Sequence, residues 1–319
     1  MKRFVLNVLA FAALLLVLLA AWAALLLRAE WRGWKEACVM PPGCDVVVCC
    51  DSQTETSLSP AAFSRLFNAS RSGTRLCQWQ LRTADVCAAN RGRIKWGIVD
   101  VPALKLWRER PDNAPNFGMA RSLAPLHLLH WRRNTVPAAS LFADFCREIW
   151  QAKSRKLIRC LVAGEQYVDS LRGGFSSYDD RGFLEHQEYV MRRMDAQAQK
   201  TLEAMRAVKI SGDAPFASLA WIDRIIADYR SCGARVVLIQ TPMHSYLASR
   251  VSEACAEADA AVERFAAERG IPFLNYRDMR FSVDEWKDGN HLNRRGAHRL
   301  TKRLKADIER LDRDRSRER

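Results

Sequence analysis

Short apolar runs alternate with helical patterns along this chain, and this alternation constrains the fold more than any other feature. The runs at 45–50 (Asp-Val-Val-Val-Cys-Cys) and 235–239 (Arg-Val-Val-Leu-Ile) are almost continuously apolar, and shorter runs follow at 66–68, 94–99 and 271–275. Helical patterns occupy 74–89, 216–231, 252–269 and 294–319. Continuous apolar strands are typical of parallel sheets that are covered by helices on both faces. We therefore expect an α/β fold with a parallel sheet of about five strands sandwiched by helices.

The middle of the chain departs from this alternation. Between about residues 111 and 215 helical stretches dominate, notably 141–153 and 183–208. Such insertions commonly shape a binding cleft, because binding residues concentrate on segments that a rigid scaffold holds. The turn-rich stretch 173–182 is either a lid or an ordinary surface loop. We expect an α/β domain over 45–312, a helical insertion at about 111–215 and a charged tail at 313–319.

The N-terminus carries a long uncharged segment. It runs from Phe4 to Leu27, 24 residues, slightly more than the ~20 that a helix needs to cross a bilayer. A removable signal peptide is the alternative, because Ala21-Trp22-Ala23 resembles a cleavage site, but the run exceeds an h-region of ~7–15 residues. We expect a cytoplasmic tail and transmembrane anchor at 1–28 and a linker at 29–44. The short tail favours a globular domain outside the cytoplasm, in the periplasm, although positive charges flank both ends of the segment.

The net charge of +14 is a strong bias that also occurs in nucleic-acid-binding proteins. Much of it lies in 294–319, where apolar residues recur at spacings of three and four. This pattern predicts an amphipathic helix with one buried stripe and a solvated basic face. We therefore expect no nucleic-acid partner.

The chain has ten cysteines, an even number that permits disulfides outside the cytoplasm. Cys38 and Cys44 flank Pro-Pro-Gly and are the expected local pair. No Cys-x-x-Cys occurs, and His127 and His130 have no third ligand in the pattern, so we expect neither a metal nor a cofactor.

Two polar segments at opposite ends of the chain supply the residue types of a catalytic triad. Asp51 and Ser52 directly follow the apolar run 45–50, and Asp288 precedes His291 by three residues. A serine after a buried strand lies at the carboxyl edge of the sheet, where open α/β sheets place their sites. His291 can act as its base, and Asp288 can hold the imidazole in one orientation. The alternatives are a helix N-cap for Ser52 and a loop hydrogen bond for His291.

These segments resemble the conserved blocks of the SGNH (GDSL-type) hydrolase superfamily. Asp51-Ser52 is similar to its Gly-Asp-Ser block, with Cys50 in place of the glycine, and 67–73 is similar to the second block. The segment Asp-Gly-Asn-His at 288–291 is similar to the third. The resemblance covers about 45–308 and implies a flavodoxin-like sheet, catalytic Ser52, His291 and Asp288, and an oxyanion hole that includes the backbone N–H of Gly73.

One block of that family is missing. Gly-x-Asn-Asp is expected after the third strand, where this chain has Ile-Val-Asp-Val-Pro at 98–102. Asn68 and Asn116 are candidates for the missing amide donor. Asp51 and His244 are further candidates for the substrate cleft, although a structural loop role is the alternative for His244. Asp100 either binds substrate or caps the following helix.

The anchor, the insertion and Gln-Thr-Pro-Met-His at 240–244 resemble a particular branch of the superfamily. It contains membrane-anchored proteins that accompany membrane-bound O-acyltransferases and modify secreted polysaccharides. The resemblance implies a serine esterase or O-acyltransferase that forms an acyl-serine intermediate and acts on cell-envelope polysaccharide, with a membrane-bound O-acyltransferase as a candidate partner. The alternative is a catalytically degenerate domain that binds a glycan or such an acyltransferase, because Cys50 and the missing block depart from the family's pattern.

Overall fold

The computed structural model describes residues 1–109 and 187–317. They fall into two compact units, one with residues 1–37 and one with the described residues from Cys38 onward. The predicted helix at 141–153, the turn-rich stretch 173–182, and Asn116, His127 and His130 lie outside the described residues.

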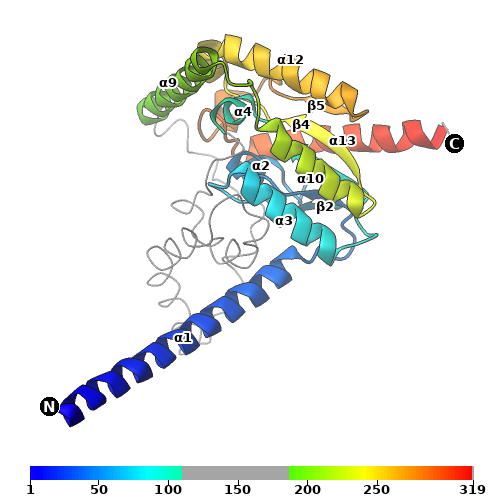
Figure 1. Cartoon of the computed structure of the whole chain (residues 1–319). Coiled ribbons are helices and arrows are strands. Elements are labelled where there is room, and N and C mark those ends of the chain that lie inside the picture. Colours follow the sequence, from blue (N-terminus) through cyan, green and yellow to red (C-terminus); the bar gives the residue numbers. More distant parts are fainter. Residues whose placement is uncertain (110–186, 318–319) are drawn as a thin grey trace. The chain divides into compact units, whose positions relative to one another are not determined.

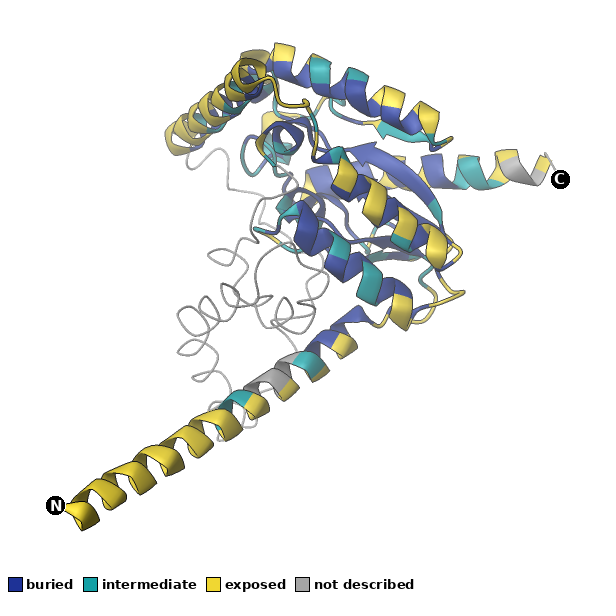
Figure 2. Cartoon of the chain, in the orientation of Figure 1, coloured by how far each residue is buried: buried dark blue, intermediate teal, exposed yellow. Residues whose placement is uncertain are grey.

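The described part of the first unit is almost entirely helix α1 (Lys2–Cys38). Its first 24 residues, Lys2–Leu25, form a helix long and apolar enough to cross a membrane, a test that a signal sequence also passes. The apolar side chains of this stretch are largely exposed (Figure 2). Because α1 continues to Cys38, much of the stretch 29–44, which we expected to be a linker, is helical.

Five parallel strands form the sheet of the second unit, which confirms the predicted α/β class (Figure 1). They are β1 (Val46–Val48), β2 (Leu66–Asn68), β3 (Trp96–Asp100), β4 (Arg235–Gln240) and β5 (Phe273–Asn275). Their order is β2-β1-β3-β4-β5, the flavodoxin-like order. The direction of chain progression reverses between β1 and β3, and ligands of open α/β sheets bind outside the carboxyl ends of the strands at such a switch point.

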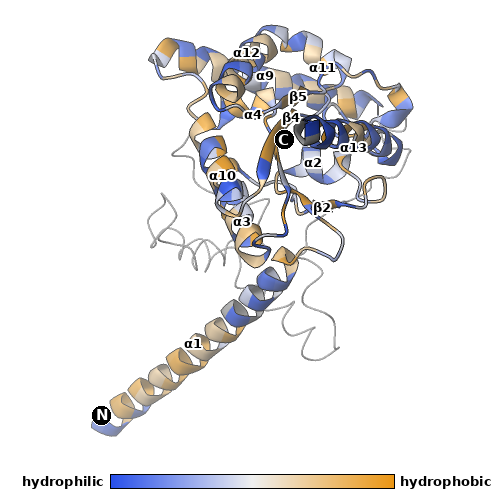
Figure 3. Ribbon diagram, turned by 90° about the vertical axis from the view of Figure 1, so that its right-hand side faces the viewer, coloured by the Kyte–Doolittle hydropathy of each residue, from blue (hydrophilic) through white to orange (hydrophobic). Residues whose placement is uncertain are grey.

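Helices cover both faces of this sheet. Helices α3 (Leu76–Ala89) and α10 (Leu219–Ser231) pack against each other on one side, and α13 (Arg294–Arg317) lies on the other (Figure 3). The predicted stripe of α13 is fully buried at Ala297, Leu300, Leu304 and Ile308, which confirms the amphipathic pattern. A Cβ added at Gly97 of β3 would lie 2.4 Å from the Tyr229 ring, so α10 needs a glycine there to pack closely.

Four further helices of the described residues pack against one another. Helix α12 (Ser252–Glu268) packs against α4 (Ala103–Arg108), α9 (Gln187–Ser211) and α11 (Ser245–Arg250). Helix α9 is the described part of the predicted insertion, and its apolar side contacts α4 and α11. The insertion helix α9 therefore borders the edge of the sheet where a site is expected.

The expected disulfide between Cys38 and Cys44 is wrong, because both thiols are free. The side chain of Asn90 donates to the carbonyl of Cys38 and accepts the N–H of Met40, at 2.8 and 2.9 Å, all within the second unit. The Cys44 thiol instead donates to the carbonyl of Ser64, at 3.6 Å. The two cysteines are thus fixed by different segments of the fold.

Candidate active site

Ser52 is the first residue of α2 (Ser52–Ser57), the short helix that follows β1. The N-cap of this helix is Asp51, whose carboxylate accepts the backbone N–H of Gln53 at 3.0 Å. Capping is therefore done by Asp51, and the alternative of Ser52 as the N-cap is wrong. The Ser52 side chain is half-buried, and its hydroxyl is available for another partner at the carboxyl edge of β1.

Asp288 and His291 lie on a tight loop that leads into α13. The backbone N–H groups of Asn290 and His291 both donate to Oδ1 of Asp288 at 3.1 Å. The carbonyl of His291 accepts the N–H of Lys287 at 2.9 Å, which closes the turn. The loop backbone thus fixes the carboxylate before any side chain binds it.

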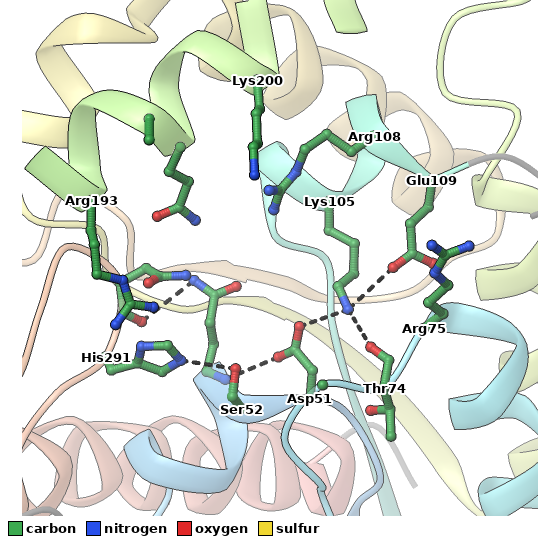
Figure 4. A pocket seen from close by; sticks show the side chains of 15 residues that line it. Asp51, Ser52, Thr74, Arg75, Lys105, Arg108, Glu109, Arg193, Lys200 and His291 are labelled. Atoms are coloured by element: carbon green, nitrogen blue, oxygen red, sulfur yellow. Dashed lines mark hydrogen bonds and ion pairs between the residues drawn. The ribbon is translucent and has the colours of Figure 1, made fainter. Parts of the chain in front are cut away.

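Ser52, His291 and Asp288 form a continuous hydrogen-bond relay, of which Figure 4 shows the contact between Ser52 and His291. Nδ1 of His291 lies 2.8 and 2.9 Å from the two carboxylate oxygens of Asp288. Nε2 of His291 lies 2.8 Å from Oγ of Ser52. A carboxylate only accepts, so Nδ1 carries the hydrogen and Nε2 accepts the serine hydroxyl. This is the arrangement in which a histidine takes a proton from a serine.

The contacts within the relay also shift the pKa values of His291 and Asp288. Burial lowers the pKa of His291, but the hydrogen bond and charge of Asp288 raise it by more, so the pKa lies above its ordinary value. Burial raises the pKa of Asp288, but His291, the backbone N–H of Asn290 and the charge of Arg193 hold it below the ordinary value. Asp288 therefore stays ionised and stabilises an imidazolium at His291.

Lys105 of α4 ties three segments of the site together, although the sequence patterns did not single it out. Its buried ammonium group lies 2.8 Å from Oδ2 of Asp51, 3.3 Å from Oε1 of Glu109 and 2.7 Å from the carbonyl of Thr74. Asp51 precedes Ser52, and Thr74 follows Gly73. One cation thus holds the segment of the serine against the segment of Gly73.

Asp100, at the end of β3, serves the sheet and not the cavity around Ser52. Its carboxylate accepts the backbone N–H and the hydroxyl of Thr241 at 3.2 and 3.0 Å. Complete burial, with the charge of Asp51, raises the pKa of Asp100 to about 7. The N-cap of α4 is Pro102, so Asp100 does not cap that helix. Asp100 therefore has neither of its two expected roles, because it neither lines the cavity of Ser52 nor caps α4. It instead links β3 to Thr241, the residue after β4.

Asn68 is occupied by backbone contacts. Its Nδ2 donates to the carbonyls of Thr54 and Leu58 at 2.9 and 2.8 Å, and its Oδ1 accepts the N–H of Ser70 at 3.0 Å. The side chain is buried and holds α2 against β2. It does not line the cavity of Ser52, so the structure does not bring it to the site as an amide donor.

Gly73 and His244 lie at different cavities. Gly73 has a φ of +74°, a left-handed conformation that favours glycine, and lines the cavity of Ser52. His244 lines a second cavity, where its ring packs edge-on against Trp286. Its Nδ1 accepts the N–H of Tyr246 at 3.2 Å as the N-cap of α11. His244 therefore has the structural loop role that the sequence analysis gave as the alternative.

The cavity beside Ser52 has a volume of about 600 Å³ (Figure 4). Ser52, His291, Asp51 and Gly73 line it, together with cationic side chains that the sequence analysis missed: Arg75, Lys105, Arg108, Arg193 and Lys200. Lys105 and Arg108 directly follow the carboxyl end of β3, a position that points to the site once the strand is known. For Arg193 and Lys200 the only signal is their spacing of seven, which places them on one face of α9.

No protein-family model matches the chain, and no curated protein matches its sequence. Among solved structures, the chain is similar to the crystal structure of a candidate acylhydrolase from Bacteroides fragilis. The two are 12% identical, with 83% of this chain and 86% of that chain covered and a TM-score of 0.35. The topology and the site themselves define an α/β protein with a serine–histidine–aspartate relay at the switch point of its sheet.

Proposed function

We propose that this protein is a membrane-anchored serine esterase or O-acyltransferase of the SGNH type, acting on cell-envelope polysaccharide outside the cytoplasm. The observation that carries the proposal is the relay from Ser52 through His291 to Asp288, which opens to a cavity at the carboxyl edge of the sheet. Hydrogen bonds of 2.8 Å at both ring nitrogens are the geometry that nucleophilic catalysis by serine requires.

In the proposed reaction, Nε2 of His291 takes the hydroxyl proton of Ser52 while Oγ attacks the acyl carbonyl. The ester C–O bond then breaks, and the imidazolium returns the proton to the departing alcohol. Water, or a sugar hydroxyl, attacks the acyl-serine in the same way and regenerates Ser52. Asp288 stabilises the imidazolium in both steps. The acceptor of the acyl group distinguishes the esterase from the transferase.

The backbone N–H groups of Ser52 and Gly73 are the proposed oxyanion donors, each worth roughly 10²–10³ in rate. Lys105 compensates in part for the missing Gly-x-Asn-Asp block. Its contacts with Asp51 and Thr74 keep the two donor segments at a fixed separation. We therefore assign Lys105 as a positioning residue of the oxyanion site.

A catalytically degenerate domain that binds a glycan or a membrane-bound O-acyltransferase is the second candidate. One observation favours it. Asn68, the predicted amide donor that lies within the described residues, does not reach the cavity of Ser52, because the backbone of α2 holds its side chain. Gln53, Gln197 and Asn290 also line the cavity, but an SGNH-like site whose expected asparagine is held elsewhere has lost one source of transition-state stabilisation.

Turnover of p-nitrophenyl acetate by the full chain in detergent tests the proposal. We expect hydrolysis that Ser52→Ala and His291→Ala each reduce by roughly 10⁶-fold. Tyr246→Phe, at an exposed hydroxyl near the second cavity, is the matched control and keeps the parent rate. A folded parent without turnover would favour the degenerate domain.

A further inference from the structure

The cavity beside Ser52 carries an excess of positive charge. Five cationic side chains line it, against two carboxylates, those of Asp51 and Glu109, which leaves three positive charges in excess among the described residues. Both carboxylates form ion pairs with one cation, Lys105. The remaining cations are Arg75 at the N-cap of α3, Arg108 of α4, and Arg193 and Lys200 of α9, and a cavity lined by an excess of one charge attracts ligands of the opposite charge.

Helix α9 supplies part of this charge in a regular pattern. Arg193, Ala196, Gln197 and Lys200 line the cavity at spacings of three, four and seven, so they share one face of α9. A different face, with Val190, Met194 and Ala198, is buried in the core. In Figure 4 the side chains of Lys200 and Arg108 extend into the same space from α9 and α4. The packing of α9 therefore directs its cationic face over the site.

The lining also limits the kind of ligand. None of the described lining residues has a large aliphatic or aromatic side chain. Among the described lining residues, apolar surface comes mainly from the stems of polar and charged side chains, so this lining suits a hydrophilic ester with several polar partners better than a long acyl chain. The volume of about 600 Å³ lies within the range of cavities that hold small ligands, roughly 300–1,000 Å³.

We propose that the cavity recognises an acidic sugar, through an anionic group near the acylated hydroxyl that Arg193, Lys200 and Arg108 bind. This inference rests on the proposed function and names its substrate class, an acyl ester of an anionic glycan. A guanidinium binds a carboxylate or a phosphate through paired hydrogen bonds, which fixes the sugar as well as attracting it. The anion is then held in the cavity that contains the Ser52 hydroxyl.

Binding to the full-length Ser52→Ala variant in detergent tests the inference without needing catalysis. The probes are an oligogalacturonate, whose anion is a carboxylate, an oligo(glycerol phosphate), whose anion is a phosphodiester, and the fully methyl-esterified oligogalacturonate, which is uncharged. We expect at least one of the two anionic probes to bind about tenfold or more tightly than the methyl ester. The anionic probe that binds more tightly identifies whether the cavity prefers a carboxylate or a phosphodiester. Equal binding of the charged and the methyl-esterified galacturonate, with no binding of the phosphate probe, overturns the inference.

Matched variants on α9 assign the effect to the cavity. Arg193→Gln and Lys200→Gln should each weaken binding of the anionic probe by about tenfold, because each removes a charged hydrogen-bond donor. Arg192→Gln, next to Arg193 but outside the cavity lining and paired with Glu188, should leave it unchanged. An equal loss in Arg192→Gln, or equally tight binding of a single-stranded oligonucleotide of the same charge, would show unspecific attraction and contradict the inference.

The same preparations separate this inference from the proposed function. Failure of the parent to hydrolyse p-nitrophenyl acetate, with specific binding of an anionic sugar retained, rejects catalysis and keeps the anion site. Hydrolysis without preference for anionic probes keeps catalysis and rejects the anion site.

Discussion

The ammonium group of Lys105 lies 2.8 Å from Oδ2 of Asp51, the residue that precedes the proposed nucleophile. The same ammonium group lies 2.7 Å from the carbonyl of Thr74, the residue after Gly73. One buried cation therefore fixes both backbone segments that we propose as oxyanion donors. Where the Gly-x-Asn-Asp block is expected, the chain has Ile-Val-Asp-Val-Pro, and the ion-paired Lys105 of the following helix lies at this edge of the sheet.

Replacing Lys105 by methionine should lower both stability and turnover. The change leaves Asp51 and Glu109 as buried carboxylates without their cation, which costs about 3–5 kcal/mol of the free energy of unfolding. Urea unfolding of the full chain in detergent measures it. Lys95→Met is the control, because Lys95 pairs with Asp45 at the surface and such pairs contribute at most ~1 kcal/mol. Equal effects of the two substitutions would contradict the account.

The pH profile of kcat/KM should report the pKa of His291. His291 acts as a base only when neutral, and Asp288 raises its pKa above the ordinary 6.5, so activity should fall on the acid side with a midpoint above 6.5. Asp288→Asn should move this midpoint down and reduce kcat by roughly 10⁴-fold. A parent midpoint at or below 6.5 would show that Asp288 does not act on the imidazole as described.

The stability that arises from the raised pKa of His291 has a definite sign. Its protonated form is favoured in the folded state, so this contribution is fully present below pH 6.5 and is lost as the pH rises through the folded pKa. The thermal midpoints of the parent and of His291→Ala should therefore differ less as the pH rises. A difference that grew with rising pH would contradict this assignment.

Gly296→Ala should destabilise the protein although it lies in a helix. Helix propensity alone predicts a gain of about 1 kcal/mol for alanine over glycine. The added Cβ, however, would lie 2.5 Å from the carbonyl oxygen of Glu285, in backbone that cannot move aside, so we expect a net loss of about 1–3 kcal/mol. Denaturant unfolding measures the sign directly, and His298→Ala on the exposed face of α13 is the near-neutral control.

The N-terminal helix should remain attached to the mature protein as a membrane anchor. The apolar part of α1 is long enough to span a bilayer, so the full chain should stay in the membrane pellet after an alkaline carbonate wash and be released by detergent. Mass spectrometry should detect peptides from residues 1–28 in that fraction. A mature chain that begins at Ala24 would show a cleaved signal peptide and reject the anchor.

The fold could be predicted largely from local patterns. The apolar runs that became β1, β3 and β4 and the stripe on α13 are periodic, and burial of these runs determines the sheet. The short helices α2, α4 and α11 could not be given bounds from the sequence, because a helix of six residues has too little periodicity to be recognised. The prediction of a disulfide between Cys38 and Cys44 failed because it used only their spacing in the chain. Spacing does not reveal that Asn90 binds the carbonyl of Cys38.

The site could be predicted only where its residues sit on sequence motifs. Ser52, Asp288 and His291 follow a strand or share a short loop, so their proximity was expected before the geometry was known. Lys105 and Arg193 reach the cavity through tertiary packing of α4 and α9, and their only sequence signals are the position of Lys105 after β3 and the spacing of Arg193 and Lys200 on α9. Asn68 had the right residue type, but backbone carbonyls of α2 compete for its amide.

Labelling with a fluorophosphonate, read by peptide mass spectrometry, tests the central claim most directly. We predict a single adduct on Ser52 in the full chain, lost in Ser52→Ala and in His291→Ala, and retained in Ser72→Ala, where an exposed serine near the site donates to Glu55. No adduct on a folded parent, or an adduct that survives His291→Ala undiminished, would contradict the assignment of Ser52 as a nucleophile activated by His291.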